Sequence, residues 1–191
     1  MVSLVKKNQE KIILGIDPGT RIMGYGVLKI TQNKPFLVAM GVVDISRTKD
    51  IYLRLGHIYK RVIGIIDSFL PDEMAIEAQF YSKNVQSVLK LGRAQGIAIA
   101  AAITRDIPIS EYEPKKIKMS VTGNGSASKE QVAGMLQNIL NIPKESMTNQ
   151  FDSTDALAVA YCHYLQSKIP HVTNRFKSWK EFVKKNADKV H

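Results

Sequence analysis

The chain has 191 residues, enough for one domain with a buried core, and a hydrophobic content of 45% that excludes a disordered polymer. Its 27 Lys and Arg residues outnumber 17 Asp and Glu residues, and the net charge of +10 favours a nucleic-acid partner, although it is also compatible with solubility alone. The single cysteine, Cys162, excludes an intramolecular disulfide and a cysteine-rich zinc site, and we expect it in the core. The sequence has no apolar run that would span a bilayer and no signal-peptide core, so we expect a cytoplasmic protein.

The first part of the chain predicts a three-stranded antiparallel meander. Strands are expected at 11–17, 23–30 and 35–44, with turns at the segments DPGT and TQNK. From residue 50 the apolar residues recur at helical spacing, and Pro71 ends that pattern. A helix over 50–70 therefore follows the meander.

The remaining elements alternate between strands and helices. Strands are expected at 73–77 and 107–113, helices at 83–104, 129–140 and 152–166, and a short helix or turn at 114–123. Ser128 and Gln131 form the pattern of a capping box before the 129–140 helix. Strands joined by helical crossovers pair in parallel, so the expected fold class is α/β, with a mixed five-stranded sheet flanked by helices.

Four carboxylates stand at the ends of predicted elements. Asp17 ends the first strand, Glu77 ends the fourth, and Asp152 and Asp155 share one face at the start of the last helix. In a mixed sheet the first and fourth strands can be neighbours, which would bring Asp17 beside Glu77. Clustered carboxylates repel one another and favour cation binding, and Mg²⁺ prefers oxygen ligands. Two such ions can promote phosphodiester hydrolysis.

Each acid also has a structural interpretation. Asp152 and Asp155 suit the N-terminus of a helix, and Asp17 suits a turn before Pro-Gly. A glutamate at the end of an apolar strand has little structural reason to be there, so Glu77 favours a functional interpretation. The four acids together therefore indicate a metal site more specifically than any one of them does. His163 lies two helical turns past Asp155, too far to join the cluster, and we expect a structural or surface role for it.

The helix expected over 83–104 has apolar residues on more than one face, and Gly92, Gly96 and Ala100 recur every four positions. A helix that is apolar nearly all round must be buried on two sides. We expect one side to pack on the sheet and the other on a second subunit of a symmetric homodimer. Burial within the monomer is the alternative.

Four blocks of the sequence resemble the motifs of the RuvC family of Holliday-junction resolvases. In chain order, from about residue 12 to residue 166, they are GIDPGTRIMGYGV, AIEAQFYSKNVQSVLKLGRAQGIAIAAA, YEPKKIKMSVTGNGSASKEQV and DSTDALAVAYCH. The resemblance implies a ribonuclease-H-like nuclease domain over 1–167. It also implies a homodimer that binds four-way DNA junctions and cuts them by paired nicks, in homologous recombination and DNA repair. A RuvA-RuvB branch-migration complex is implied as a partner.

By motif position, the resemblance assigns catalysis and metal binding to Asp17, Glu77, Asp152 and Asp155. Some members of the family have His where this chain has Asp152. The implied cofactor is Mg²⁺, two ions in each site, with Mn²⁺ as a substitute.

The same resemblance suggests residues that contact DNA. Phe80 stands where the family has an aromatic residue that reaches the junction centre, and an exposed ring can stack on unpaired bases. Lys118 and Lys129 stand where the family has basic residues near DNA, and Lys83 and Arg93 are further basic candidates. The structural alternatives are a loop anchor for Phe80 and solvated surface for the basic residues.

Residues 168–191 have seven Lys and Arg residues against two acids, and we expect a basic tail separate from the nuclease domain. The tail is either a binding arm or a solvated end.

Three other functions compete with junction resolution. The segment IDPGT also fits the phosphate-binding turn of actin-like and sugar kinases, but those proteins need a second lobe and a second such loop. A junction-binding protein without catalysis would be expected to lack some of the four acids. A nuclease of the same fold with another structured nucleic acid as substrate is the hardest alternative to separate.

Overall fold

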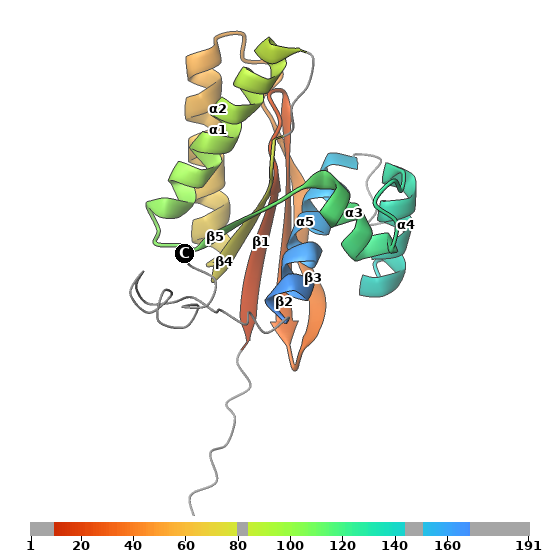
Figure 1. The fold of residues 1–191 in the computed structure, drawn as a ribbon. Helices are drawn as coiled ribbons and strands as arrows, with labels where there is room; N and C mark the ends of the chain where they lie inside the picture. Colours follow the sequence, from red (N-terminus) through yellow and green to blue (C-terminus); the bar gives the residue numbers. More distant parts are fainter. Residues whose placement is uncertain (1–9, 80–83, 144–150, 169–191) are drawn as a thin grey trace, which may run out of the picture.

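The structure is a computed structural model that describes residues 10–79, 84–143 and 151–168. Its elements are β1 (Lys11–Asp17), β2 (Ile22–Thr31), β3 (Lys34–Asp44), α1 (Ile51–Phe69), β4 (Glu73–Glu77), α2 (Val85–Ile103), β5 (Ile109–Tyr112), α3 (Pro114–Thr122), α4 (Lys129–Leu140) and α5 (Phe151–Ser167). The five strands form one sheet in the order β3-β2-β1-β4-β5 (Figure 1). Among the described residues, none of the helices has the length and apolar character needed to cross a membrane.

The sheet is mixed, as the sequence predicts. β1, β2 and β3 pair antiparallel, whereas β4 pairs parallel to β1 and β5 pairs parallel to β4. The expected fifth strand at 107–113 is too long at both ends, because β5 spans only Ile109–Tyr112. Asp106 has a left-handed backbone (φ 55°), and the Ile107 N–H caps α2 by donating to the Ala102 carbonyl, so Ile107 belongs to the connection. The expected basic tail lies outside the described residues apart from Lys168.

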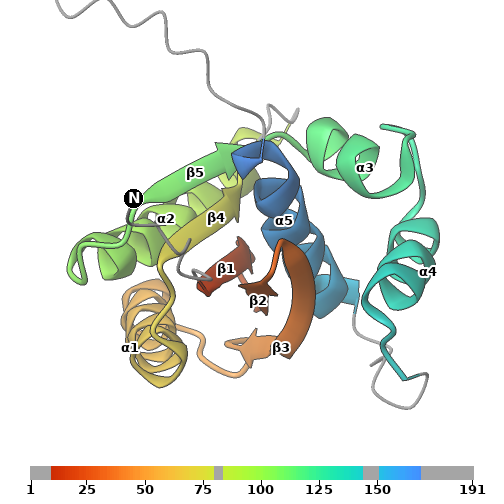
Figure 2. The same cartoon turned by 90° about the horizontal axis from the view of Figure 1, so that it is seen from below.

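Helices cover both faces of the sheet. Figure 2 shows α1 and α2 on one face, α5 on the other, and α3 with α4 beyond α5. β1 is buried on both sides: Leu14 packs in the core under α1 and α2, and Ile13 packs in the core under α5. A strand that is covered on both faces reads as a continuous apolar run, which explains the segment IILGI.

The helix α5 lies against the sheet with its backbone in contact. A β-carbon on Gly15 of β1 would stand 2.2 Å from the Ala156 carbonyl oxygen, and one on Gly24 of β2 would stand 1.8 Å from the Asp152 carbonyl oxygen. Any side chain at these positions would push the helix outward, since real β-carbons do not approach that closely. Glycine at these two positions therefore determines how closely the first turns of α5 approach the sheet.

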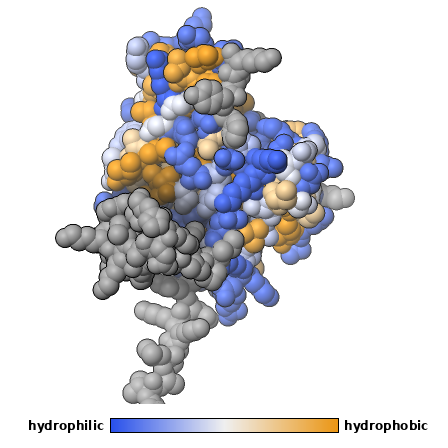
Figure 3. Space-filling view, in the orientation of Figure 1, coloured by the Kyte–Doolittle hydropathy of each residue, from blue (hydrophilic) through white to orange (hydrophobic). Residues whose placement is uncertain are grey.

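The helix α2 is buried along one side only. Ala94, Ala98, Ala101 and Ala102 face the core, whereas Val85 and Leu89 are 64% and 53% exposed. Figure 3 shows hydrophobic side chains gathered over α2. The expectation that the protein is a homodimer stays a prediction.

Candidate active site

Two of the four predicted acids end neighbouring parallel strands. Asp17 is the last residue of β1 and Glu77 the last residue of β4. Ile16 is paired with Ile76 in the ladder, so the next residue of each strand lies at the same edge of the sheet. This register brings the two carboxylates side by side.

The other two acids come from the start of α5. Asp152 is the second residue of the helix and lies in its first turn, with Asp155 three residues further on. Oxygen atoms of Asp17, Asp152 and Asp155 all lie within 4.8 Å of one another. Glu77 lines a cavity of about 130 Å³ together with Asp17 and Asp155. The structure thus brings carboxylates from two strands and one helix to a single small cavity.

The carboxyl groups of this cavity hold protons more tightly than free side chains do. Burial raises the pKa of Asp17 well above its ordinary value, and the charges of Glu77 and Asp155 raise it further. Burial, with a contribution from Asp155, raises the pKa of Glu77 to about 7. Burial also raises the pKa of Asp155, although the hydrogen bond from Lys129 acts in the opposite direction. Without a bound cation, the full set of negative charges is therefore unfavourable.

Two predicted lysines border the same cavity. Lys118 projects from α3 and Lys129 from the first position of α4, and both lower the pKa of Glu77 through their charges. The Lys129 ammonium donates a hydrogen bond to Asp155. The predicted capping box is present: the Ser128 hydroxyl accepts from the Gln131 N–H, and the Gln131 side chain accepts from the Ser128 N–H (2.9 Å). This cap fixes the start of α4 and so the position of Lys129.

The other predicted DNA-contact residues are Arg93, Phe80 and Lys83. Arg93 is exposed on α2 and is not among the residues that line it. Phe80 and Lys83 lie outside the described residues.

His163 and Cys162 have the structural roles expected for them. Cys162, a residue of α5, is fully buried in the core between α5 and the sheet. His163 is buried too; its Nδ1 shares a hydrogen bond of 2.8 Å with the Tyr112 hydroxyl, and its Nε2 contacts the Glu73 carboxylate. These contacts tie the second half of α5 to Glu73, the first residue of β4, and to Tyr112, the last residue of β5.

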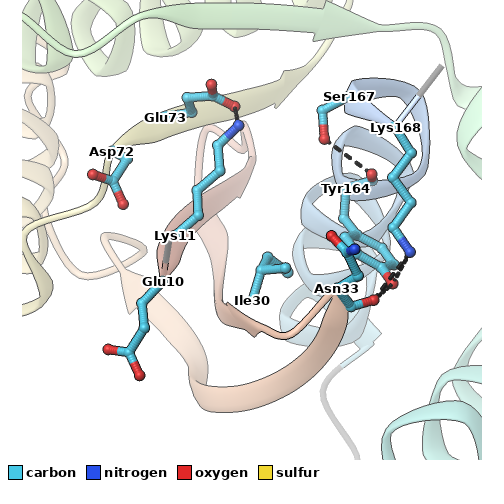
Figure 4. Close-up of a pocket in the computed structure, with 9 residues that line it drawn as sticks. All are labelled: Glu10, Lys11, Ile30, Asn33, Asp72, Glu73, Tyr164, Ser167 and Lys168. Atoms are coloured by element: carbon cyan, nitrogen blue, oxygen red, sulfur yellow. Dashed lines mark hydrogen bonds and ion pairs between the residues drawn. The ribbon is translucent and has the colours of Figure 1, made fainter. Parts of the chain in front are cut away.

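A larger cavity, of about 760 Å³, lies at the opposite end of the sheet. Figure 4 shows its lining from the start of β1, the start of β4 and the end of α5. Its charged groups have partners: Lys11 pairs with Glu73, and Lys168 donates to the Asn33 carbonyl (3.1 Å). Asp72 accepts a hydrogen bond of 2.7 Å from the Ile12 N–H. Because these groups satisfy one another, the smaller acidic cavity is the candidate active site.

The sequence analysis missed the residues that set the depth of α5. Glycines inside an apolar strand signal a close approach of another backbone, and the segment GYG in β2 carried that signal. Gly24 in this segment lies under Asp152, so it supports the cluster without supplying a ligand.

The donor set of the cavity fits a hard divalent cation. It consists of carboxylate oxygens, three of them mutually within 4.8 Å, beside a fourth acid. A bound cation would offset the burial and the mutual repulsion that raise the pKa values of these acids. A mixed α/β sheet that carries such a cluster beside two lysines defines a nuclease of the ribonuclease-H-like class, with an acidic cluster consistent with metal dependence.

Comparisons with known proteins agree with this class. The family model described as Crossover junction endodeoxyribonuclease RuvC matches residues 13–163. Curated proteins of that name from Bacteroides fragilis and Porphyromonas gingivalis are each 57% identical to this chain. The first alignment covers 98% of this chain and 100% of the relative, and the second covers 95% and 98%. The chain therefore belongs to the RuvC family.

Solved structures show the same fold. The structure of Thermus thermophilus RuvC in complex with a Holliday junction substrate has a TM-score of 0.74 and 32% sequence identity, and the match covers 82% of this chain and 94% of that chain. The yeast mitochondrial Holliday junction resolvase Ydc2 has a TM-score of 0.57 at 14% identity, covering 81% and 82% of the two chains, and shares the fold. The predicted ribonuclease-H-like fold class is thus confirmed.

Proposed function

We propose that this chain resolves four-way DNA junctions by paired, symmetric nicks, through metal-dependent hydrolysis of phosphodiester bonds, in homologous recombination and DNA repair. The observation that carries the proposal is the mutual approach of Asp17, Asp152 and Asp155 within 4.8 Å, next to Lys129, in a chain of net charge +10. The crossover junction endodeoxyribonucleases that match almost the whole chain support it. The IDPGT segment then belongs to a nuclease site, and the kinase alternative has no support.

We assign Asp17, Glu77, Asp152 and Asp155 as the metal ligands and Mg²⁺ as the metal, with two ions in each site and Mn²⁺ as a substitute. Bound Mg²⁺ supplies an activated water and stabilisation of the leaving oxygen. Asp17 and Glu77 hold their carboxylates at the ends of paired strands, so their separation is set by the sheet register. Lys129 holds Asp155 by a hydrogen bond and fixes the orientation of that carboxylate.

Lys118 and Lys129 place positive charge at the border of the cavity, where a phosphate of the DNA would enter. Preorganised positive charge stabilises negative charge that develops on the phosphate in the transition state. The expected products carry a 5′-phosphate and a 3′-hydroxyl.

The junction is proposed to be bound by a cytoplasmic homodimer whose two acidic cavities act on two strands of like polarity. The apolar side chains exposed on α2 support a subunit contact there. Phe80, Lys83 and Arg93 are proposed to contact the junction, and RuvA-RuvB is proposed as the motor that delivers it.

The test uses end-labelled synthetic four-way junctions with mobile cores, incubated with Mg²⁺ and either wild type or Asp17→Asn. A linear duplex of matched sequence is the control substrate. Symmetric nicks in the junction alone, lost in Asp17→Asn while junction binding persists, would support the proposal. Equal cutting of the linear duplex would keep the nuclease and reject junction specificity. Tight binding without any cutting would point to an architectural protein.

A further inference from the structure

The partly buried guanidinium of Arg54, in the first turn of α1, connects two loops. Its Nε and Nη2 both donate to the Thr48 carbonyl, at 2.9 and 2.6 Å, and its Nη1 donates to the Thr20 carbonyl at 3.0 Å. Thr48 lies in the connection between β3 and α1, and Thr20 lies in the turn between β1 and β2. Within residues 10–79, 84–143 and 151–168, Arg54 forms no salt bridge, and its guanidinium donates to backbone carbonyls instead.

The turn that Arg54 holds begins directly after Asp17. It is tight: a β-carbon on Gly19 would stand 1.6 Å from the Ile22 carbonyl oxygen. The Arg21 carbonyl is held as well, because it accepts a hydrogen bond of 2.9 Å from the N–H of the buried Ile45. Two consecutive carbonyls of the turn are therefore anchored, that of Thr20 to α1 and that of Arg21 to the segment that leads into α1.

These hydrogen bonds to the turn affect the acidic cluster because β1 ends at Asp17, directly before the turn. Asp17 is the last residue of β1 in the ladder, where it is paired with Gly24 of β2, and the ladder with β4 ends one residue earlier, at Ile16. Beyond Asp17 the chain continues directly into the turn. A turn that shifted would carry the Asp17 carboxylate away from Asp152 and Asp155, which belong to a different element. Ligands and catalytic groups need to be held within fractions of an ångström, and a misplacement of about 1 Å can reduce a rate about 100-fold.

We propose that Arg54 is a positioning residue for the acidic cluster: by bridging the Thr20 and Thr48 carbonyls it holds Asp17 at the spacing that a divalent cation requires. The inference rests on the proposed function of the cluster. It assigns Arg54 no contact with DNA or metal.

The side chain is specific for this task. A guanidinium has donors spread over a rigid plane, so that one group reaches two carbonyls in different directions. Lysine keeps the charge but concentrates its donors on one nitrogen at the end of a flexible chain. Methionine keeps most of the apolar stem and removes every donor.

The experiment compares wild type with Arg54→Met and Arg54→Lys, and uses Arg105→Met as the matched control. Arg105 forms a two-contact ion pair with Asp67 (2.8 and 3.0 Å), and neither residue lines the acidic cavity. The first readout is the affinity of DNA-free protein for Mn²⁺, measured by electron paramagnetic resonance and calorimetry. The second is the nicking rate at saturating junction and metal, and the third is junction affinity in EDTA.

Both Arg54 variants are expected to bind Mn²⁺ about 10-fold more weakly than wild type and to nick at least about 10-fold more slowly, with junction affinity in EDTA unchanged. Arg105→Met is expected to match wild type in all three readouts. Mn²⁺ affinity in Arg54→Met equal to that of Arg105→Met would overturn the inference. Wild-type Mn²⁺ affinity in Arg54→Lys would also overturn it, because a positive charge without the bridging geometry would then be enough to position Asp17. If Arg54→Met does not fold, the comparison with Arg54→Lys still tests the inference. If wild type binds Mn²⁺ but cuts no junction, the proposed function fails while the Mn²⁺ comparison still decides the role of Arg54.

Discussion

Gly24 of β2 lies directly beneath the Asp152 carbonyl, at a distance that leaves no space for a β-carbon. The first turn of α5, which contains Asp152 and leads into Asp155, therefore rests on the backbone of β2, the strand beside β1. This contact therefore determines how far Asp152 and Asp155 lie from Asp17.

Replacing Gly24 with alanine should separate the acids. The added β-carbon would stand 1.8 Å from the Asp152 oxygen, so the first turn of α5 must shift. We expect a loss of stability of about 1–3 kcal/mol from overpacking and a nicking rate at least about 100-fold lower. Thermal unfolding and the junction-nicking assay measure the two effects.

Gly64→Ala is the matched control for this substitution. Gly64 lies on the exposed side of α1, where a β-carbon would meet no other atom within 4 Å. Alanine there should stabilise the helix by about 0.5–1 kcal/mol and leave nicking unchanged. If Gly24→Ala nicked junctions at the wild-type rate, the close packing of α5 on β2 would not be what positions the four acids.

The buried acids of the cavity should make the stability of the metal-free protein depend on pH. Burial, with a contribution from Asp155, raises the pKa of Glu77 from 4.5 to about 7. A raised pKa in the folded state means that stability is lost as pH rises from about 4.5 to about 7, because the folded protein must give up a proton that the unfolded chain has already lost. Glu77→Gln should thus stabilise the protein in EDTA by about 1–3 kcal/mol at about pH 8 and by much less at about pH 5. A stabilisation that is equal at both pH values would contradict this electrostatic account.

A divalent cation should reverse that penalty. Mg²⁺ or Mn²⁺ competes with protons for Asp17 and Glu77, whose pKa values burial raises first and neighbouring acids raise further. We expect the increase in Tm caused by the metal to be larger at about pH 8 than at about pH 6. Differential scanning calorimetry with and without metal measures the shift. Asp17→Asn should show little shift at either pH, and a shift of wild-type size in this variant would place the cation elsewhere.

His163 should matter for stability and not for cutting. Burial opposes the charge of Glu73, but the hydrogen bonds from Lys11 and His163 prevail and lower its pKa. His163→Ala should cost about 2–4 kcal/mol through the lost contacts with Tyr112 and Glu73 and the cavity that remains. The nicking rate of the folded protein should stay the same. His57→Ala, at an exposed position on α1, should change stability by less than about 0.5 kcal/mol.

The pH dependence of this penalty follows from the lowered pKa of Glu73. A lowered pKa gives stability that is present above the ordinary value of 4.5 and is lost as pH falls through the folded-state value. The difference between wild type and His163→Ala, measured by urea unfolding, should therefore shrink in acid. A His163→Ala protein that is as stable as wild type but fails to cut would show that His163 acts in the site.

Much of this architecture was accessible from sequence because each element carries a local pattern. Alternating and helical periodicities located β1 through α5, Ser128 with Gln131 marked the start of α4, and carboxylates at element ends indicated the acidic cluster. Such patterns depend on neighbours in the chain, and a single sequence displays them directly.

Features that depend on distant backbone atoms were not accessible. The contacts of Arg54 go to carbonyls of Thr20 and Thr48, and every residue has a carbonyl, so no pattern identifies the partner. The depth of α5 depends on Gly15 and Gly24, which a single sequence presents simply as glycines within strands. The extent of β5 depended on the left-handed backbone at Asp106, which asparagine and aspartate adopt in some contexts only.

The acidic cavity joins the beginning of the described chain to its end, since Asp17 belongs to the first strand and Asp155 to the last helix. A ribosome that is still translating the middle of the message has therefore made β1 and β4 but not the helix that completes the cluster. Nascent chains and products of premature termination before α5 lack two of the four acids. With the four acids assigned as metal ligands, as proposed above, such unfinished copies would lack a complete metal site, so synthesis through α5 would be a condition for cutting.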